Sequence, residues 1–228
     1  ADQVLKTDGS GSLSWTAASS GASNVNGLSD ALIEDNSLYL GQDPSSTTST
    51  AEYNLSMGAT ALDAVTTGDA NIAIGHDALS ANTTGSGNLA IGYGAYANAD
   101  TEGNNLAIGR GALGGSMNGG EFNIAIGNYS LDDNTSGDRN VALGYVALTQ
   151  NSTGTFNVAI GNGASQLNSS GSSNTSLGNN SMYSNTSANY NTAIGAEALY
   201  DVARTSDTDG YNTALGYNAG NTGPNDII

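Results

Sequence analysis

The chain alternates polar and apolar residues in one short phrase, which it repeats along most of its length. The phrase is Asn-Ile-Ala-Ile-Gly at residues 71–75. It returns with small changes at 88–92, 105–109, 123–127, 140–144, 157–161, 174–178, 191–195 and 212–216. Looser copies stand at 54–58 and 38–41. Successive copies lie 17 residues apart, except for one step of 18 and a last step of 21. A fixed period of this size is the signature of a repeat architecture.

Each copy predicts a short β-strand, because successive side chains of a strand point to opposite faces. In the copy at 71–75, Ile72 and Ile74 share one face and Ala73 takes the other. We expect the two aliphatic positions to stack as the core and the alanine column to lie on the opposite, outer face. Small groups there would permit close approach of a neighbouring chain. A second apolar pair, as at Ala78 and Leu79, predicts a second strand in each coil.

Glycine ends each phrase, where a strand must bend sharply and another backbone lies close. These repeat glycines are Gly58, Gly75, Gly92, Gly109, Gly127, Gly144, Gly161, Gly178, Gly195 and Gly216. A polar turn that leads back to the next strand follows, as in Asn82-Thr83-Thr84-Gly85. Here we expect the asparagine amide to bond its own backbone and the glycine to supply a positive φ. The same asparagines stand in Asn-x-Ser/Thr sequons, which this turn geometry already explains.

The sequence therefore predicts an all-β protein, a parallel β-solenoid of about ten or eleven 17-residue coils over residues 37–228. Residues 1–36 are expected to be an N-terminal extended segment and linker, with two short extended pieces around an Asp-Gly turn in 4–15. Of the 228 residues, 11% are charged, 37% are hydrophobic and 32 are glycine. This composition suits a thin solenoid, whose coils each bury a few apolar side chains against their neighbours.

Charge narrows the range of partners. Four basic against 21 acidic residues give a net charge of −17, which repels phosphate backbones, so we expect no nucleic-acid binding. The chain has no cysteine, hence no disulfide framework and no thiolate site. No apolar run approaches the ~20 residues of a membrane span, so we expect no membrane insertion.

The stretch Asn-Thr-Ala-Ile-Gly-Ala-Glu-Ala-Leu at 191–199 resembles the YadA-like head repeat of trimeric autotransporter adhesins and bacteriophage tail fibre proteins. The resemblance covers roughly residues 37–220. It implies a left-handed parallel β-roll, a homotrimer of three chains side by side, and surface attachment outside the cell or on a virion. The coil is longer than the usual adhesin-head repeat, and neither a heptad stalk nor a membrane anchor follows in the sequence. These departures favour a phage-type fibre.

The leading hypothesis is a non-enzymatic structural and adhesive fibre module that spaces or presents a surface for a host-cell glycan or protein. The alternatives are a tailspike-like fibre that binds or hydrolyses glycans, a self-stacking extracellular filament subunit, and an ice-binding solenoid. A hydrolase needs two facing acids, but Asp132 and Asp133 fall in an expected turn, where solvated acids are ordinary. Ice binding needs a flat threonine row. His76, the only histidine, is expected on an exposed turn face without a catalytic or metal role.

The irregular step between Gly195 and Gly216 is the candidate contact site, because insertions in solenoids surface as loops that often carry binding function. Its charged and aromatic residues are Tyr200, Asp201, Arg204, Asp207, Asp209 and Tyr211. They offer a charged fork, carboxylate acceptors and aromatic faces to a glycan or an ion. A longer turn held by an Arg–Asp pair is the alternative. We expect no cofactor beyond a weakly held surface calcium ion, which turn carboxylates suit.

Overall fold

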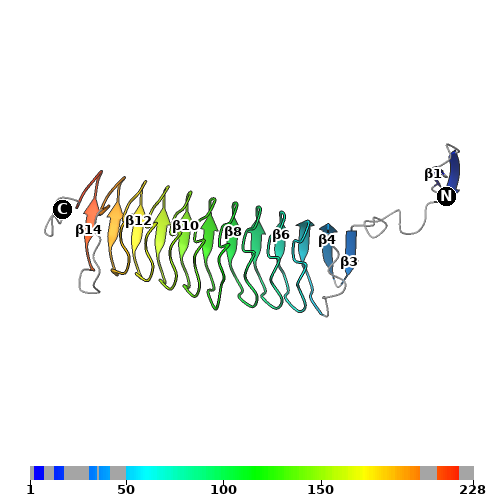
Figure 1. Ribbon diagram of the computed structural model, residues 1–228, viewed down its shortest axis with the longest axis horizontal. Coiled ribbons are helices and arrows are strands. Elements are labelled where there is room, and N and C mark those ends of the chain that lie inside the picture. The colour runs from blue at the N-terminus through cyan, green and yellow to red at the C-terminus, as the bar shows by residue number, and fades with distance from the viewer. Residues whose placement is uncertain are drawn as a thin grey trace.

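The computed structural model describes residues 3–7, 13–17, 31–34, 36–41, 50–200 and 210–220, and describes side chains from residue 36 onward. These residues form strands and turns, with no helix among them (Figure 1). Strand β1 (Gln3–Thr7) pairs antiparallel with β2 (Leu13–Ala17) as a separate two-stranded sheet. The two extended pieces expected around the Asp-Gly turn are therefore confirmed.

A single 12-stranded sheet runs along the rod in Figure 1. It begins with β3 (Ala31–Glu34), which pairs antiparallel with β4 (Ser37–Gly41). The parallel strands that follow β4 are β5 (Leu55–Gly58), β6 (Ile72–Ile74), β7 (Leu89–Ile91), β8 (Leu106–Ile108), β9 (Ile124–Ile126), β10 (Val141–Leu143), β11 (Val158–Ile160), β12 (Thr175–Leu177), β13 (Thr192–Ile194) and β14 (Thr213–Leu215). Each pairs with its counterpart one coil away, so Ala142 lies opposite Ala159. The all-β parallel solenoid, with about nine turns, is confirmed. The division expected at residue 37 stays a prediction.

The two faces of the sheet are the reverse of our expectation. The alanines at the centre of the strands are buried, with Ala73, Ala125 and Ala142 fully inaccessible to solvent. Their aliphatic neighbours face outward, and Ile72 and Leu143 are 37% and 40% exposed. The expected isoleucine core and outer alanine column are therefore wrong. Each coil closes on itself within 17 residues, so its interior is narrow: most strands contribute one methyl group to it and the turns contribute the larger side chains, with Tyr39 in β4 as an exception.

The second apolar pair of each coil lies in a turn, so the second strand expected there is wrong. Ala78 and Leu79 are both fully buried, yet Leu79 has a left-handed φ of 51°. The same conformation recurs at Leu113 and Leu148. A left-handed leucine costs about 1–2 kcal/mol, which the ~1.5–3 kcal/mol from burying its side chain offsets. The turn thus supplies the large core residue that the strand cannot.

Every repeat glycine has a positive φ, between +121° and +141°, at the bend that the sequence predicts. A Cβ on Gly75 would lie 2.5 Å from the carbonyl oxygen of Gly92 in the next coil, so the close backbone approach is confirmed there. The turn glycines behave differently, because Gly85, Gly137 and their equivalents do not have positive φ. Our expectation for them is wrong. A side chain at Gly137 would instead collide with the carbonyl of Gly154.

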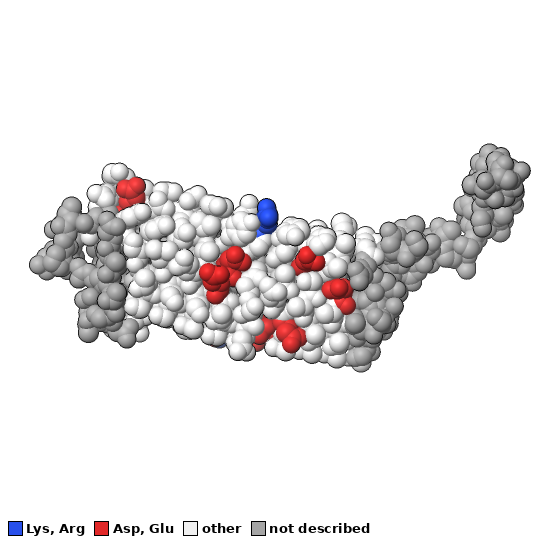
Figure 2. Space-filling model, viewed as in Figure 1, with Lys and Arg blue, Asp and Glu red and all other residues white. Residues whose placement is uncertain are grey.

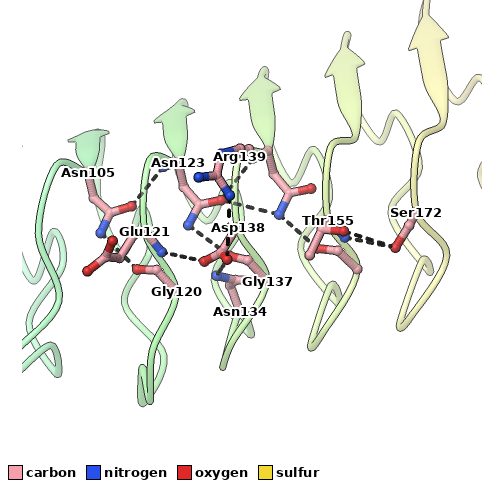
Figure 3. A network of polar contacts seen from close by, with 12 residues as sticks. Asn105, Gly120, Glu121, Asn123, Asn134, Gly137, Asp138, Arg139, Thr155 and Ser172 are labelled. Atoms are coloured by element: carbon pink, nitrogen blue, oxygen red, sulfur yellow. Dashed lines mark hydrogen bonds and ion pairs between the residues drawn. The ribbon is translucent and has the colours of Figure 1, made fainter.

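Two ladders of buried asparagines join the coils, and Figure 3 shows Asn105 and Asn123 of the first ladder with Asn134 of the second. In the first ladder, which begins each strand, the backbone N–H of Asn123 donates to Oδ1 of Asn105 at 2.8 Å. In the second, within the turns, Nδ2 of Asn151 donates to Oδ1 of Asn134 at 2.9 Å. The ladders meet at one carbonyl per coil: Nδ2 of Asn123 and Nδ2 of Asn134 both donate to the Gly137 oxygen at 2.9 Å. The turn role expected for the sequon asparagines is confirmed.

The turn ladder is interrupted over two coils next to the 18-residue step, where Ala99 and Met117 hold the positions of its asparagines. Ala99 stands where the next turn asparagine would be, and Oδ1 of Asn82 is accordingly buried without a hydrogen-bond partner. Glu102 replaces the turn glycine and is 5% exposed. Its carboxylate accepts from the backbone N–H groups of Asp100 at 3.1 Å and Gly119 at 2.8 Å. The glutamate therefore supplies acceptors to the backbone that the longer turn leaves without ladder partners.

Asn151→Ala should lower the melting temperature by several degrees. The variant removes the amide that donates to Oδ1 of Asn134 and leaves that buried oxygen unpaired, which costs about 1–3 kcal/mol, while the Gly154 carbonyl keeps its bond from Asn140. Circular dichroism melting of the wild type and of Asn162→Ala, an exposed asparagine of the same coil, provides the comparison. Equal melting of the two variants would contradict the ladder's role.

Ser56→Ala should raise stability by about 1–2 kcal/mol, because the Ser56 hydroxyl is buried with no partner in a column that is otherwise mostly alanine. Ser176→Ala is the matched control from the same column. Its hydroxyl accepts from Ser165 at 2.9 Å and donates to the Val158 carbonyl, so that variant should lose stability. Chemical denaturation measures both; a loss in Ser56→Ala would count against this assignment.

Candidate interaction surfaces

The outer face of the sheet is an aliphatic strip. Its two columns hold the first and third residue of each short strand, and all of these residues are partly or fully exposed. The first column runs through Leu38, Leu55, Ile72, Leu89, Leu106, Ile124, Val141 and Val158, and the second through Leu40, Met57, Ile74, Ile91, Ile108, Ile126, Leu143, Ile160, Leu177, Ile194 and Leu215. Contiguous apolar surface of this extent marks an interaction site.

The first column changes character near the C-terminal end of the sheet. Thr175, Thr192 and Thr213 occupy it in β12, β13 and β14, in register with the valines before them. The strip is therefore less apolar over these last three strands. Leu215 at its end is 65% exposed.

Aromatic and cationic side chains stack along the rod in a second kind of surface. The guanidinium carbon of Arg139 lies 5.1 Å from the ring centroid of Phe122 and 5.5 Å from that of Phe156. Arg139 also approaches Asp138, with Nη1 3.9 Å from Oδ2. These residues come from successive coils, so the rings face along the rod axis toward one another.

A similar stack follows the repeat glycines. The rings of His76 and Tyr93 lie 5.4 Å apart at 14°, and the Arg110 guanidinium is 5.6 Å from the Tyr93 ring. Nδ1 of His76 is 2.8 Å from Oδ2 of Asp77. The His76 side chain is 53% exposed, so its expected place on an exposed turn face is confirmed.

The two tyrosines of the predicted contact site belong to different stacks. Tyr200 packs on Tyr183, with ring centroids 5.1 Å apart, and Tyr211 packs on Tyr190 at 4.9 Å. Ring packing between coils therefore occupies one face of each tyrosine. Asp201, Arg204, Asp207 and Asp209 lie outside the described residues, so the charged fork stays a prediction.

Two acids of the turns, Asp132 and Asp63, are partly buried. Burial raises the pKa of the Asp132 carboxyl above its ordinary range, the Asp133 charge raises it further, and a hydrogen bond from the Gly114 backbone opposes the shift. Burial likewise raises the pKa of Asp63. Within the described ranges, no three His, Cys, Asp or Glu residues gather closely enough to hold a metal ion.

Figure 2 shows the acidic side chains on one face as small separate groups with neutral surface between them. A search of the described residues for a helix long and apolar enough to cross a membrane finds none. Comparison of the chain with protein-family models, with curated proteins and with solved structures finds no match. The candidate surfaces are therefore defined by geometry alone: the aliphatic strip and the aromatic stacks.

Asp132→Asn should raise the melting temperature at pH 7. A carboxyl whose pKa is raised on folding stabilises the fold fully below its unfolded value of about 3.8, and this stability is lost as pH rises through the folded value. The asparagine avoids that loss, so its advantage should vanish as the pH falls below about 3.8. Melting from pH 3 to 7 checks this. Asp69→Asn, at an exposed turn, serves as control, and a gain that does not depend on pH would refute the explanation.

Proposed function

We propose that the chain is a non-enzymatic, adhesive fibre module that assembles as a homotrimer of left-handed β-rolls. In this proposal it works outside the cell or on the virion surface, as a tail fibre or adhesin segment, and spaces or presents a surface for a host-cell glycan or protein. The aliphatic strip is the observation that carries the proposal, since a rod with such a face gains stability by covering it.

The strip is large enough for stable association. Two partly exposed aliphatic side chains per coil over the length of the sheet amount to apolar surface on the order of 1,000 Å². Stable protein interfaces bury about 800 Å² per partner, and monomers rarely leave more than a few hundred Å² of contiguous apolar surface exposed. Because the strip lies on one side of the rod and runs parallel to its axis, parallel chains can cover it along its whole length.

The proposed trimer contacts differ from those expected from the sequence. The alanine column is buried inside each coil, so it cannot pack against a neighbouring chain. The aliphatic columns take its place at the interface. Three parallel rods around one axis form a closed cyclic assembly in which every strip meets the other two. The choice of three chains and of the left hand rests on the resemblance to the YadA-like head repeat.

Self-stacking into a filament is less well supported. β3 pairs antiparallel with β4, and the exposed edge of the sheet at that end therefore belongs to a strand of opposite direction. A second molecule could continue the parallel sheet only if the edge strands of both molecules ran in the same direction. The antiparallel strand β3 therefore disfavours end-to-end addition of a second molecule at this end of the rod.

Leu143→Asp should convert the trimer to monomers while each coil stays folded. Leu143 is 40% exposed on the strip, so its carboxylate would be solvated in the single chain and desolvated at the interface, which costs several kcal/mol. Light scattering measures the mass, and circular dichroism checks the fold. Thr153→Asp, at an exposed turn of the same coil, is the control and should remain trimeric. A wild-type monomer at micromolar concentration would overturn the proposal.

A further inference from the structure

One aromatic column has a gap with a defined shape. The column holds the residue that precedes the ladder asparagine in each coil, and over its last six coils these residues are Phe122, Arg139, Phe156, Ser173, Tyr190 and Tyr211. We propose that Phe156 and Tyr190, with Ser173 between them, bind the guanidinium group of an arginine side chain from a partner protein. This site is separate from the aliphatic strip and goes beyond the proposed fibre function.

The slot is the gap between the Phe156 and Tyr190 rings at Ser173, and the backbone places these three residues in strict register. The N–H of Phe156 donates to the Asp138 carbonyl at 3.0 Å, that of Ser173 to Thr155 at 2.9 Å, and that of Tyr190 to Ser172 at 3.1 Å. Their φ angles are 58°, 58° and 60°. Equal backbone conformations in a regular stack direct the three side chains the same way, one coil apart.

The chain fills an equivalent gap itself two positions earlier in the column. Phe122 and Phe156 are two coils apart, as Phe156 and Tyr190 are, and the Arg139 guanidinium lies between them. The two distances from its carbon place the rings no more than about 11 Å apart. The Arg139 sandwich therefore shows which chemical group a two-coil spacing accommodates in this column, a planar cation in contact with two ring faces.

Both ring faces that border Ser173 are available. Arg139 covers one face of Phe156, and Tyr211 stacks on one face of Tyr190 at 4.9 Å. Their other faces are directed toward Ser173, whose side chain ends at its hydroxyl. Two strand spacings of ~4.8 Å, less the thickness of the rings, leave space for one flat layer. The Phe156 and Tyr190 side chains are 55% and 54% exposed, so the slot opens to solvent.

The surroundings favour a guanidinium group. It is flat, weakly hydrated and stacks on aromatic rings, whereas a sugar ring in its chair form is thicker. The adjacent residues Thr155, Ser172 and Asn189 carry neutral oxygen acceptors, and Ser172 accepts from the Thr155 backbone at 3.0 Å. A net charge of −17 attracts cations to the rod in general.

The test is a titration of the full chain, in its native assembly, with ethylguanidinium, followed through the aromatic NMR signals. Ethylurea, a neutral molecule of nearly the same shape, is the matched probe, and methyl glucoside tests a glycan. We expect saturable shifts of the Phe156 and Tyr190 ring signals with ethylguanidinium only. Equal shifts with ethylurea, shifts with methyl glucoside alone, or no saturable shift would overturn the proposal.

Substitutions test whether ethylguanidinium binds at the slot. Tyr190→Leu should weaken it by about two- to fivefold, the effect of losing one ring from the sandwich. Tyr53→Leu, at an exposed tyrosine of the same column outside the slot, should leave it unchanged. Ser173→Arg should fill the slot as Arg139 fills its own, abolish the response and raise the melting temperature by about 2–4 °C. A Ser173→Arg protein that still binds ethylguanidinium would contradict the assignment. If Ser173→Arg fails to fold, the Tyr190→Leu titration decides the question.

Discussion

Stacked asparagine side chains fix the register of the rod, and the rest of the structure depends on them. A coil of 17 residues is too thin to bury much apolar surface, so its interior must also satisfy backbone groups that no water reaches. Each amide does this twice: Oδ1 of Asn140 accepts from the Asn157 backbone at 3.0 Å, and Nδ2 of Asn140 donates to the Gly154 carbonyl at 2.8 Å. Because one amide side chain links two coils, a shift in register would leave several buried groups unpaired at once.

This arrangement explains why large aliphatic residues lie outside. With asparagine and alanine filling the strand side of the interior and one leucine the turn side, the coil has no room for the two branched residues of each strand. They form the strip instead. In the proposed trimer, the apolar surface that a single chain leaves exposed would be buried between chains.

The sequence alone was sufficient for the period, the short strand of each phrase, the bends at the repeat glycines and the backbone bonds of the turn asparagines, because each of these follows from local chemistry. It was not sufficient to predict which face of each strand points into the coil. Alternation of Ile72, Ala73 and Ile74 defines two faces, and the general rule that larger apolar residues are inside selects the wrong one when the interior is this narrow. The left-handed conformation of Leu79 has no local signal either, because leucine rarely adopts it and burial alone stabilises it there. The aromatic stacks could be predicted only from the register of the coils. Phe122, Arg139 and Phe156 follow one another at steps of 17 residues and become neighbours only when the coils are aligned.

Stacking at about 4.8 Å also limits which residues a column can hold, since every side chain meets its counterparts above and below. Alanine, asparagine and aliphatic groups are compatible with their own kind, and aromatic rings stack. Like charges repel at this distance. The charged residues of the rod accordingly depend on their neighbours: Arg110 and Arg139, two of only four basic residues, each lie against two aromatic rings. The long columns of the rod are therefore uncharged, and its aliphatic strip and aromatic stacks are the surfaces left for favourable contacts.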